Sequence, residues 1–230
     1  MFLGLVAVCL HALLLHQWID ISSGQNLNFF NLLSLAVWLV AVLLLVMALF
    51  RSVEVLVLFL FPVSAISILL VLRFPEAEII QTTSSPDALF HILLSVVTFC
   101  VLSVAGLLAI LLAFQDSLLR RRQSSIFIEK LPPLETLEQL LFQVNGLGFI
   151  LLSALITTSL YFYYDLLWVS AALLQKTLLA ATAWIIFAVL LWGRFVWGWR
   201  GRKAIYGTLI GVVLLFLAYF GSKILLRALH

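Results

Sequence analysis

The chain has 230 residues, of which 65% are hydrophobic and only 10% are charged. This composition excludes a soluble globular protein and predicts a protein that crosses a membrane several times. The net charge of +3 gives no reason to expect a nucleic-acid partner, because basic residues in a membrane protein mainly report the side of the bilayer on which a loop lies.

Seven apolar stretches predict transmembrane helices, and we expect an all-α helical bundle that forms one transmembrane domain over residues 1–230. The expected spans are residues 1–19, 29–50, 55–72, 88–114, 140–163, 176–192 and 204–220. Their lengths are close to the about 20 residues that a helix needs to cross a bilayer core. The first stretch has no small-residue cleavage site and no preceding Lys or Arg, so we expect it to be retained as a helix.

The first span carries His11 and His16. His11 lies roughly 15 Å along the helix, near the middle of the membrane, where an ionisable residue is by default a candidate functional residue. The alternative is a histidine that hydrogen-bonds to a neighbouring helix. The two histidines are five positions apart, which is about 140° around a helix, so they cannot hold one ion from the same face.

The fourth span is the longest uncharged stretch, and His91 lies near its start. The triplet Arg120, Arg121 and Arg122 follows its end, and positive residues beside a span stay on the cytoplasmic side. His91 is therefore expected near the outer face. Neutral imidazole is the commonest metal ligand, so His91 is a candidate ligand for a metal or haem iron. The alternative is an interfacial side chain that hydrogen-bonds to water, lipid or a neighbouring loop.

The later chain has two features besides its spans. The leucine spacing of LETLEQLLFQ predicts a short helix on the cytoplasmic surface that leads into the fifth span. In that span Gly146 and Gly148 are expected to permit close packing of helices. The semi-apolar link at residues 165–175 is expected to lie along the outer membrane surface.

The basic residues predict the orientation of the chain, with the N-terminus inside and the C-terminus outside. Nine of them fall inside on the seven-span arrangement: Arg51, Arg120, Arg121, Arg122, Lys130, Arg194, Arg200, Arg202 and Lys203. Four fall outside: Arg73, Lys176, Lys223 and Arg227. No charged residue lies deep in a span, which weighs against a proton pump or a coupled transporter.

The motifs of common enzymes are missing from the sequence. There is no Ser, His and Asp set, no Gly-rich phosphate loop and no HExxH, so we expect no conventional enzyme activity. Cys9 and Cys100 lie inside apolar spans and form neither a disulfide framework nor a CxxC redox site.

On this arrangement the outer ends of spans one, four and six bring His16, His91 and Lys176 to the outer leaflet. Haem needs one or two axial ligands, typically His, and its propionates favour a nearby cation, for which Lys176 or Arg73 is available. We therefore predict a cofactor site from His91, His11, His16 and Lys176, in which His91 and His11 are the candidate iron ligands.

Five segments in order carry a resemblance to a known family: HILLS at His91, LPPLETLEQLLFQ, QKTLLAATAWIIFAVLLWGR, GWRGRKA and LAYFGSK. They resemble the haem-handling membrane proteins of cytochrome c assembly, and most of all the YpjD-type inner-membrane branch. The similarity covers residues 91–225 in detail. It implies a multi-pass protein of the bacterial inner membrane that carries or presents haem at the outer face for attachment to apocytochrome c.

The resemblance also implies roles for residues. In this family two outward histidines flank a tryptophan-rich haem-binding segment, and His91 matches the first. Gln175 stands where the second would fall, and the outer link offers only Trp168. The expected partners are the lipid bilayer and either apocytochrome c or another assembly subunit.

A function from a different class is the alternative: a scaffold or accessory subunit without haem, in a system such as divalent-metal export, whose histidines are structural. Gln175 favours this alternative, whereas His91 and His11 favour haem handling.

Overall fold

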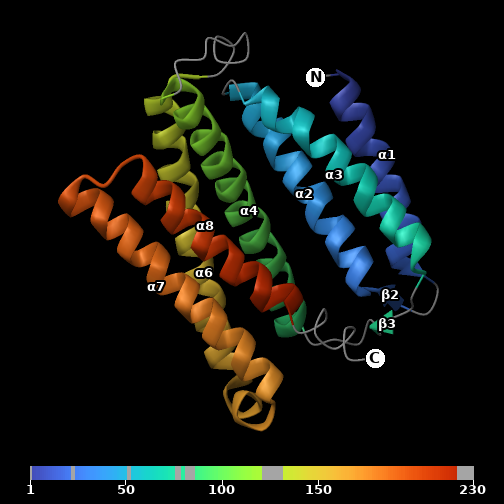
Figure 1. Cartoon of the computed structure of the whole chain (residues 1–230). Helices are drawn as coiled ribbons and strands as arrows, with labels where there is room; N and C mark the ends of the chain where they lie inside the picture. Colours follow the sequence, from blue (N-terminus) through green and yellow to red (C-terminus); the bar gives the residue numbers. More distant parts are fainter. Residues whose placement is uncertain are drawn as a thin grey trace. The chain divides into compact units, whose positions relative to one another are not determined.

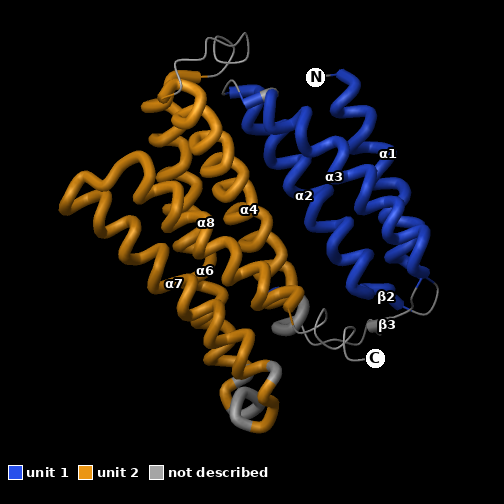
Figure 2. Tube along the Cα trace, viewed as in Figure 1, with its two compact units in different colours: residues 1–90 blue, residues 91–230 orange. Residues whose placement is uncertain are grey.

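The computed structural model of the chain describes residues 2–21, 24–50, 53–75, 79–80, 86–120 and 132–221. Within these residues seven helices are long and apolar enough to cross a membrane (Figure 1). The predicted all-α, polytopic fold is therefore confirmed. The chain divides into two compact units, residues 1–90 and 91–230, which are described one at a time (Figure 2). The single transmembrane domain expected from the sequence stays a prediction.

Three helices form the first unit: α1 (Phe2–Ile19), α2 (Phe29–Phe50) and α3 (Glu54–Arg73). Helix α2 packs against both α1 and α3, and it buries Val40 and Leu44 completely or nearly so. The indole Nε1 of Trp38 on α2 donates to the carbonyl of Val8 on α1 at 2.9 Å. The unit thus has an apolar core with a few polar contacts between helices.

A small antiparallel sheet closes one end of this unit. Its strands are β1 (Asp20–Ile21), β2 (Gly24–Asn26) and β3 (Ile79–Ile80), in the order β1-β2-β3. Gln25 pairs with Asp20 on one side and with Ile80 on the other. The strands are two or three residues long and pair only the segments that connect helices, so the fold class stays all-α.

The second unit contains the helices α6 (Leu134–Val169), α7 (Ala171–Trp197) and α8 (Arg202–Phe216), the π-helix η1 (Leu217–Gly221) and most of α4 (Pro86–Arg120). Close approach of the helices occurs at small residues. A Cβ on Gly148 of α6 would lie 2.3 Å from the Leu102 side chain of α4, whereas one on Gly146 would meet nothing within 4 Å. Of the two glycines expected to permit close packing, Gly148 does so.

Helix α6 differs from the sequence expectation at both ends. The short separate helix expected over LETLEQLLFQ is the first part of α6, because helix-forming residues continue without a break into the span. The expected link at residues 165–175 is also helical except at Ser170. That residue caps α7, because its hydroxyl oxygen accepts a hydrogen bond from the backbone N–H of Leu173 at 3.4 Å.

The turn between α7 and α8 is fixed by one carboxylate. Glu138 of α6 accepts a hydrogen bond from Arg194 at 2.8 Å and one from the backbone N–H of Gly201 at 3.2 Å. Gly201 has φ +57°, a left-handed conformation that favours glycine. The Trp199 ring packs against Gly193, where a Cβ would lie 2.4 Å from the ring.

Apart from Lys176, the described cations of the second unit gather at the end that holds this turn. Arg194 and Arg200 lie 2.8 and 3.9 Å from Glu138, and Arg120 and Arg202 line one cavity. The other basic residues counted for orientation include Arg51, Arg121, Arg122, Lys130, Lys223 and Arg227, which lie outside the described residues. The orientation of the termini therefore stays a prediction.

Candidate functional site

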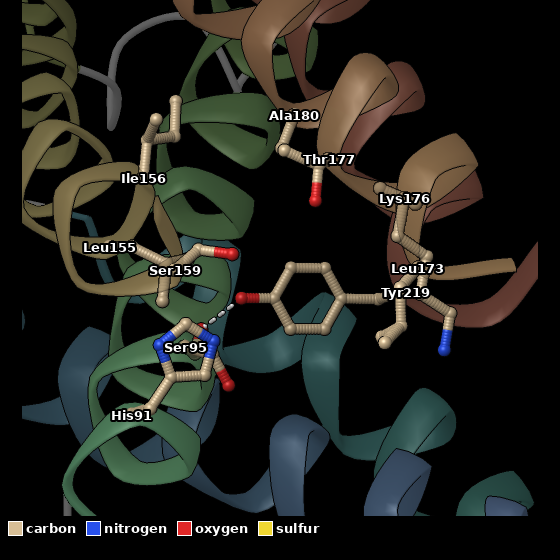
Figure 3. Close-up of a pocket in the computed structure, with 11 residues that line it drawn as sticks. His91, Ser95, Leu155, Ile156, Ser159, Leu173, Lys176, Thr177, Ala180 and Tyr219 are labelled. Atoms are coloured by element: carbon tan, nitrogen blue, oxygen red, sulfur yellow. Dashed lines mark hydrogen bonds between the residues drawn. The ribbon is translucent and has the colours of Figure 1, made fainter. Parts of the chain in front are cut away.

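A cavity of about 340 Å³ lies in the second unit beside His91 (Figure 3). Its polar lining residues are His91, Ser95, Ser159, Lys176, Thr177 and Tyr219. Its apolar lining residues are Leu155, Ile156, Leu173, Ala180 and Ala218. This volume is at the lower end of the roughly 300–1,000 Å³ found for small-molecule pockets, and mostly apolar walls with a few polar groups are typical of them.

The hydrogen bonds around His91 define which ring nitrogen carries the proton. Its Nδ1 lies 3.1 Å from the Thr158 hydroxyl oxygen. That hydroxyl donates its one hydrogen to the carbonyl of Leu155 at 2.9 Å. These two contacts together favour the tautomer in which Nδ1–H donates to Thr158 and Nε2 carries the lone pair. Ligating histidines are commonly held this way, with one ring N–H fixed by a neighbour and the other nitrogen presented to the metal.

Lys176 lies in the first turns of α7 and lines the same cavity. Figure 3 shows its side chain on the opposite side of the Tyr219 ring from His91. The sequence predicted that His91 and Lys176 belong to one site, and the fold brings both to one cavity. Gln175, beside Lys176, is exposed.

Tyr219 crosses the cavity and is the main feature that the sequence did not predict. Its hydroxyl donates to the carbonyl of Ser95 at 2.6 Å (Figure 3). Tyr219 belongs to the π-helix η1, and π-helical turns occur often at functional sites. The segment LAYFGSK was noticed only as part of a family resemblance, and hydropathy alone gives no sign of a π-helix.

His11 lies in the first unit and is buried, with 4% of its surface exposed. Its Nε2 is 2.9 Å from the Ser34 hydroxyl, which lies 3.4 Å from the Ser67 hydroxyl. Ser67 donates to the carbonyl of Ser64 at 2.8 Å, so Ser34 donates to Ser67 and His11 Nε2–H donates to Ser34. This chain of donors links α1, α2 and α3, as expected for a histidine that hydrogen-bonds to neighbouring helices.

His16 has a different environment at the end of α1. Its Nδ1 lies 2.6 Å from the Asp20 carboxylate, and its side chain is 72% exposed. His16 and Arg73 both lie in the first unit, so their predicted grouping with His91 stays a prediction. The side chain of Trp168 is outside the described residues.

No group of three or more His, Cys, Asp or Glu side chains that could hold a metal ion occurs in the described residues. Haem has a different requirement, because its macrocycle supplies four iron ligands and the protein supplies one or two. The donor set at the His91 cavity fits this requirement with one imidazole nitrogen, one ammonium group and apolar walls.

Comparisons with known proteins agree on one family. A family model described as "Cytochrome C assembly protein" matches residues 2–230. The chain is similar to "Inner membrane protein YpjD" from Escherichia coli (strain K12), with 32% identity over 223 residues, which are 96% of this chain and 84% of that protein.

Two partial similarities extend this result. "Cytochrome c biogenesis protein CcsA" from Gloeothece citriformis is 28% identical over 106 residues, which are 46% of this chain and 32% of that protein. An uncharacterized 28.8 kDa protein from Azospirillum brasilense is 31% identical over 137 residues, which are 58% of this chain and 49% of that protein. No solved structure matches the chain.

Proposed function

Because the chain belongs to the cytochrome c assembly protein family, we propose that it binds or presents haem at the outer face of the membrane for cytochrome c assembly. The protein is a multi-pass protein of the bacterial inner membrane. The observation that carries the proposal is the cavity of the second unit, which both His91 and Lys176 line. Family membership favours this function over a scaffold for divalent-metal export.

His91 is the residue that we propose would hold the haem iron. Its Nε2 carries the lone pair, while Thr158 accepts a hydrogen bond from Nδ1–H and fixes the ring. Histidine ligands are commonly oriented in this way, by a hydrogen bond from the ring nitrogen that does not bind the metal. When haem is bound, the Nε2 of His91 would donate its lone pair to the iron.

Lys176 is the proposed partner of the haem propionates. A cation beside a carboxylate in a mostly apolar cavity gives a charge-assisted hydrogen bond, which is stronger than a neutral one. Leu155, Ile156 and Leu173 line the cavity with apolar walls, which would exclude water from a bound macrocycle. The predicted partner is apocytochrome c or another assembly subunit.

His11 stays a predicted iron ligand and His16 a predicted residue of the cofactor site, and both lie outside this proposal. His11 already donates from Nε2 to Ser34, so ligation through this nitrogen would break the chain of donors between three helices. His16 pairs with Asp20 at the end of α1.

The first test is the absorption spectrum of the full chain purified from haem-replete cells. We expect a Soret band in the wild type and its loss in His91→Ala, because the axial ligand is removed. His16→Ala is the matched control and should keep the band. A colourless, folded wild type would contradict haem binding, and equal losses in the two variants would contradict the assignment to His91.

A further inference from the structure

A second cavity, of about 280 Å³, lies between the last turns of α4 and the first turns of α8. It is separated from the His91 cavity by most of the length of α4, because His91 and Arg120 are 29 residues apart and a helix rises 1.5 Å per residue, roughly 43 Å in all. The haem proposal does not use it. Its polar lining residues are Asp116, Ser117, Arg120, Arg202 and Tyr206.

The charges around this cavity do not cancel. The Nε of Arg120 donates to both carboxylate oxygens of Asp116, at 3.1 and 3.0 Å, so these two charges are paired. Arg202 is exposed, and in the described part of the chain its guanidinium has no ion-pair partner. The neighbouring Arg194 and Arg200 face Glu138 instead. One positive charge at the cavity rim is therefore left for an anion.

The start of α8 strengthens this positive charge. Gly201, the N-cap, has no side chain to cap the helix, and its own N–H donates to Glu138, so the partial positive charge that remains is that of the N–H groups in the turn after it. The guanidinium of Arg202 lies in the same turn. A phosphate group is the anion that arginine and backbone N–H groups bind well together.

The rest of the cavity is apolar. Ala113, Ile205 and Leu209 line it below the arginines, within helices that are long enough to cross a membrane. A free phosphate ion would use the charged rim and leave these walls in contact with water. A phospholipid would use both, because its headgroup carries the phosphate and its acyl chains are apolar.

We propose that this cavity binds the phosphate headgroup of an anionic phospholipid, with Arg202 at the phosphate and the apolar walls against the start of the acyl chains. Basic pockets between transmembrane helices on the cytoplasmic side are sites where anionic lipid headgroups bind. The predicted orientation puts this cavity on that side.

The test uses the purified full-length protein in detergent, with lipid binding measured by native mass spectrometry. Phosphatidylglycerol should bind more tightly than phosphatidylcholine, and Arg202→Gln should weaken phosphatidylglycerol binding about five-fold. Arg200→Gln is the matched control, because it removes the same charge two positions away and outside the cavity. It should leave binding unchanged, and Arg202→Lys should keep most of it.

A second variant separates a lipid from free phosphate. Ala113→Phe fills the apolar part of the cavity without a change of charge, so it should weaken binding of phosphatidylglycerol. Inorganic phosphate at millimolar concentration should not displace the lipid from the wild type. Equal binding of the two lipids, displacement by inorganic phosphate, or the same loss in Arg200→Gln as in Arg202→Gln would overturn the proposal. None of these measurements depends on haem.

Discussion

At the scale of single residues, His91 and His11 show that hydrogen-bond partners determine which ring nitrogen of a histidine carries the proton. Both were candidate ligands because each is an imidazole on an apolar span. The structure gives them opposite tautomers: His91 donates from Nδ1 to Thr158, and His11 donates from Nε2 to Ser34. A sequence shows that an imidazole is present, but its tautomer depends on side chains from other helices.

The role of Thr158 gives a testable prediction that rests on the proposed function. Thr158→Val removes the oxygen that accepts from His91 Nδ1–H, and loss of such a partner typically lowers metal affinity about 10-fold to 100-fold. We expect a haem affinity at least about ten-fold weaker in a titration followed by Soret absorbance. Thr157→Val is the control, because the neighbouring hydroxyl is exposed and donates only to the carbonyl of Ser153 at 2.9 Å. An unchanged affinity in Thr158→Val would contradict the assigned tautomer.

The same comparison shows how far sequence reasoning reached at this scale. His91 and Lys176 were predicted as parts of one site, because each stands at the end of a span that was expected to be outside. Thr158 and Tyr219 were missed, because their contribution depends on how α6 and η1 are rotated toward α4. Hydropathy fixes where a helix crosses a membrane but leaves its rotation undetermined when apolar residues occupy every face.

At the scale of elements, α6, α7 and α8 are joined by the Glu138 carboxylate. Arg194 lies over the Phe142 ring at 4.7 Å and also donates to the carbonyl of Trp199 at 3.2 Å. Glu138 and Arg194 are only 14% and 21% exposed, so their ion pair is screened less than a pair on the surface. The sequence indicated a basic loop here, but it gave no sign that a glutamate 56 positions earlier would bind it.

Loss of this carboxylate should destabilise the second unit. Glu138→Gln leaves Arg194 without its charged partner, and hydrogen bonds to charged groups contribute about 1.5–3 kcal/mol. We therefore expect the free energy of unfolding in detergent, followed by circular dichroism, to fall by about 1–3 kcal/mol. Glu135→Gln, an exposed position in the first turn of α6, should change it by less than about 0.5 kcal/mol. Equal effects would mean that Glu138 does not hold the turn.

The boundaries of the helices show where sequence patterns are reliable. The span expected at residues 29–50 coincides with α2, because polar residues flank a continuous apolar run. Helix α6 extends beyond the span expected at residues 140–163 at both ends, because polarity changes there while helix-forming residues continue. Polarity reports the membrane boundary, and helices need not end at it.

At the scale of the whole molecule, the proposed function depends on which side of the membrane each end of the second unit faces. In that unit one end carries the His91 cavity, and the other carries Arg120, Arg194 and Arg202. A cluster of cations is retained on the cytoplasmic side, which would leave His91 outside. The outer location of the haem site and the cytoplasmic location of the lipid site therefore depend on the same orientation.

Labelling of single cysteines tests this orientation. The background carries Cys9→Ser and Cys100→Ala. In spheroplasts, whose outer membrane has been removed and whose inner membrane is intact, we expect Thr82→Cys to react with a membrane-impermeant maleimide. Ser125→Cys should react only after the inner membrane is permeabilised, because the arginine triplet beside it stays in the cytoplasm. The reverse pattern would put His91 on the cytoplasmic side, and haem presented there could not be attached to an apocytochrome outside the membrane. Such a result would contradict the outer-face proposal even if His91 binds haem, because binding and orientation are separate requirements.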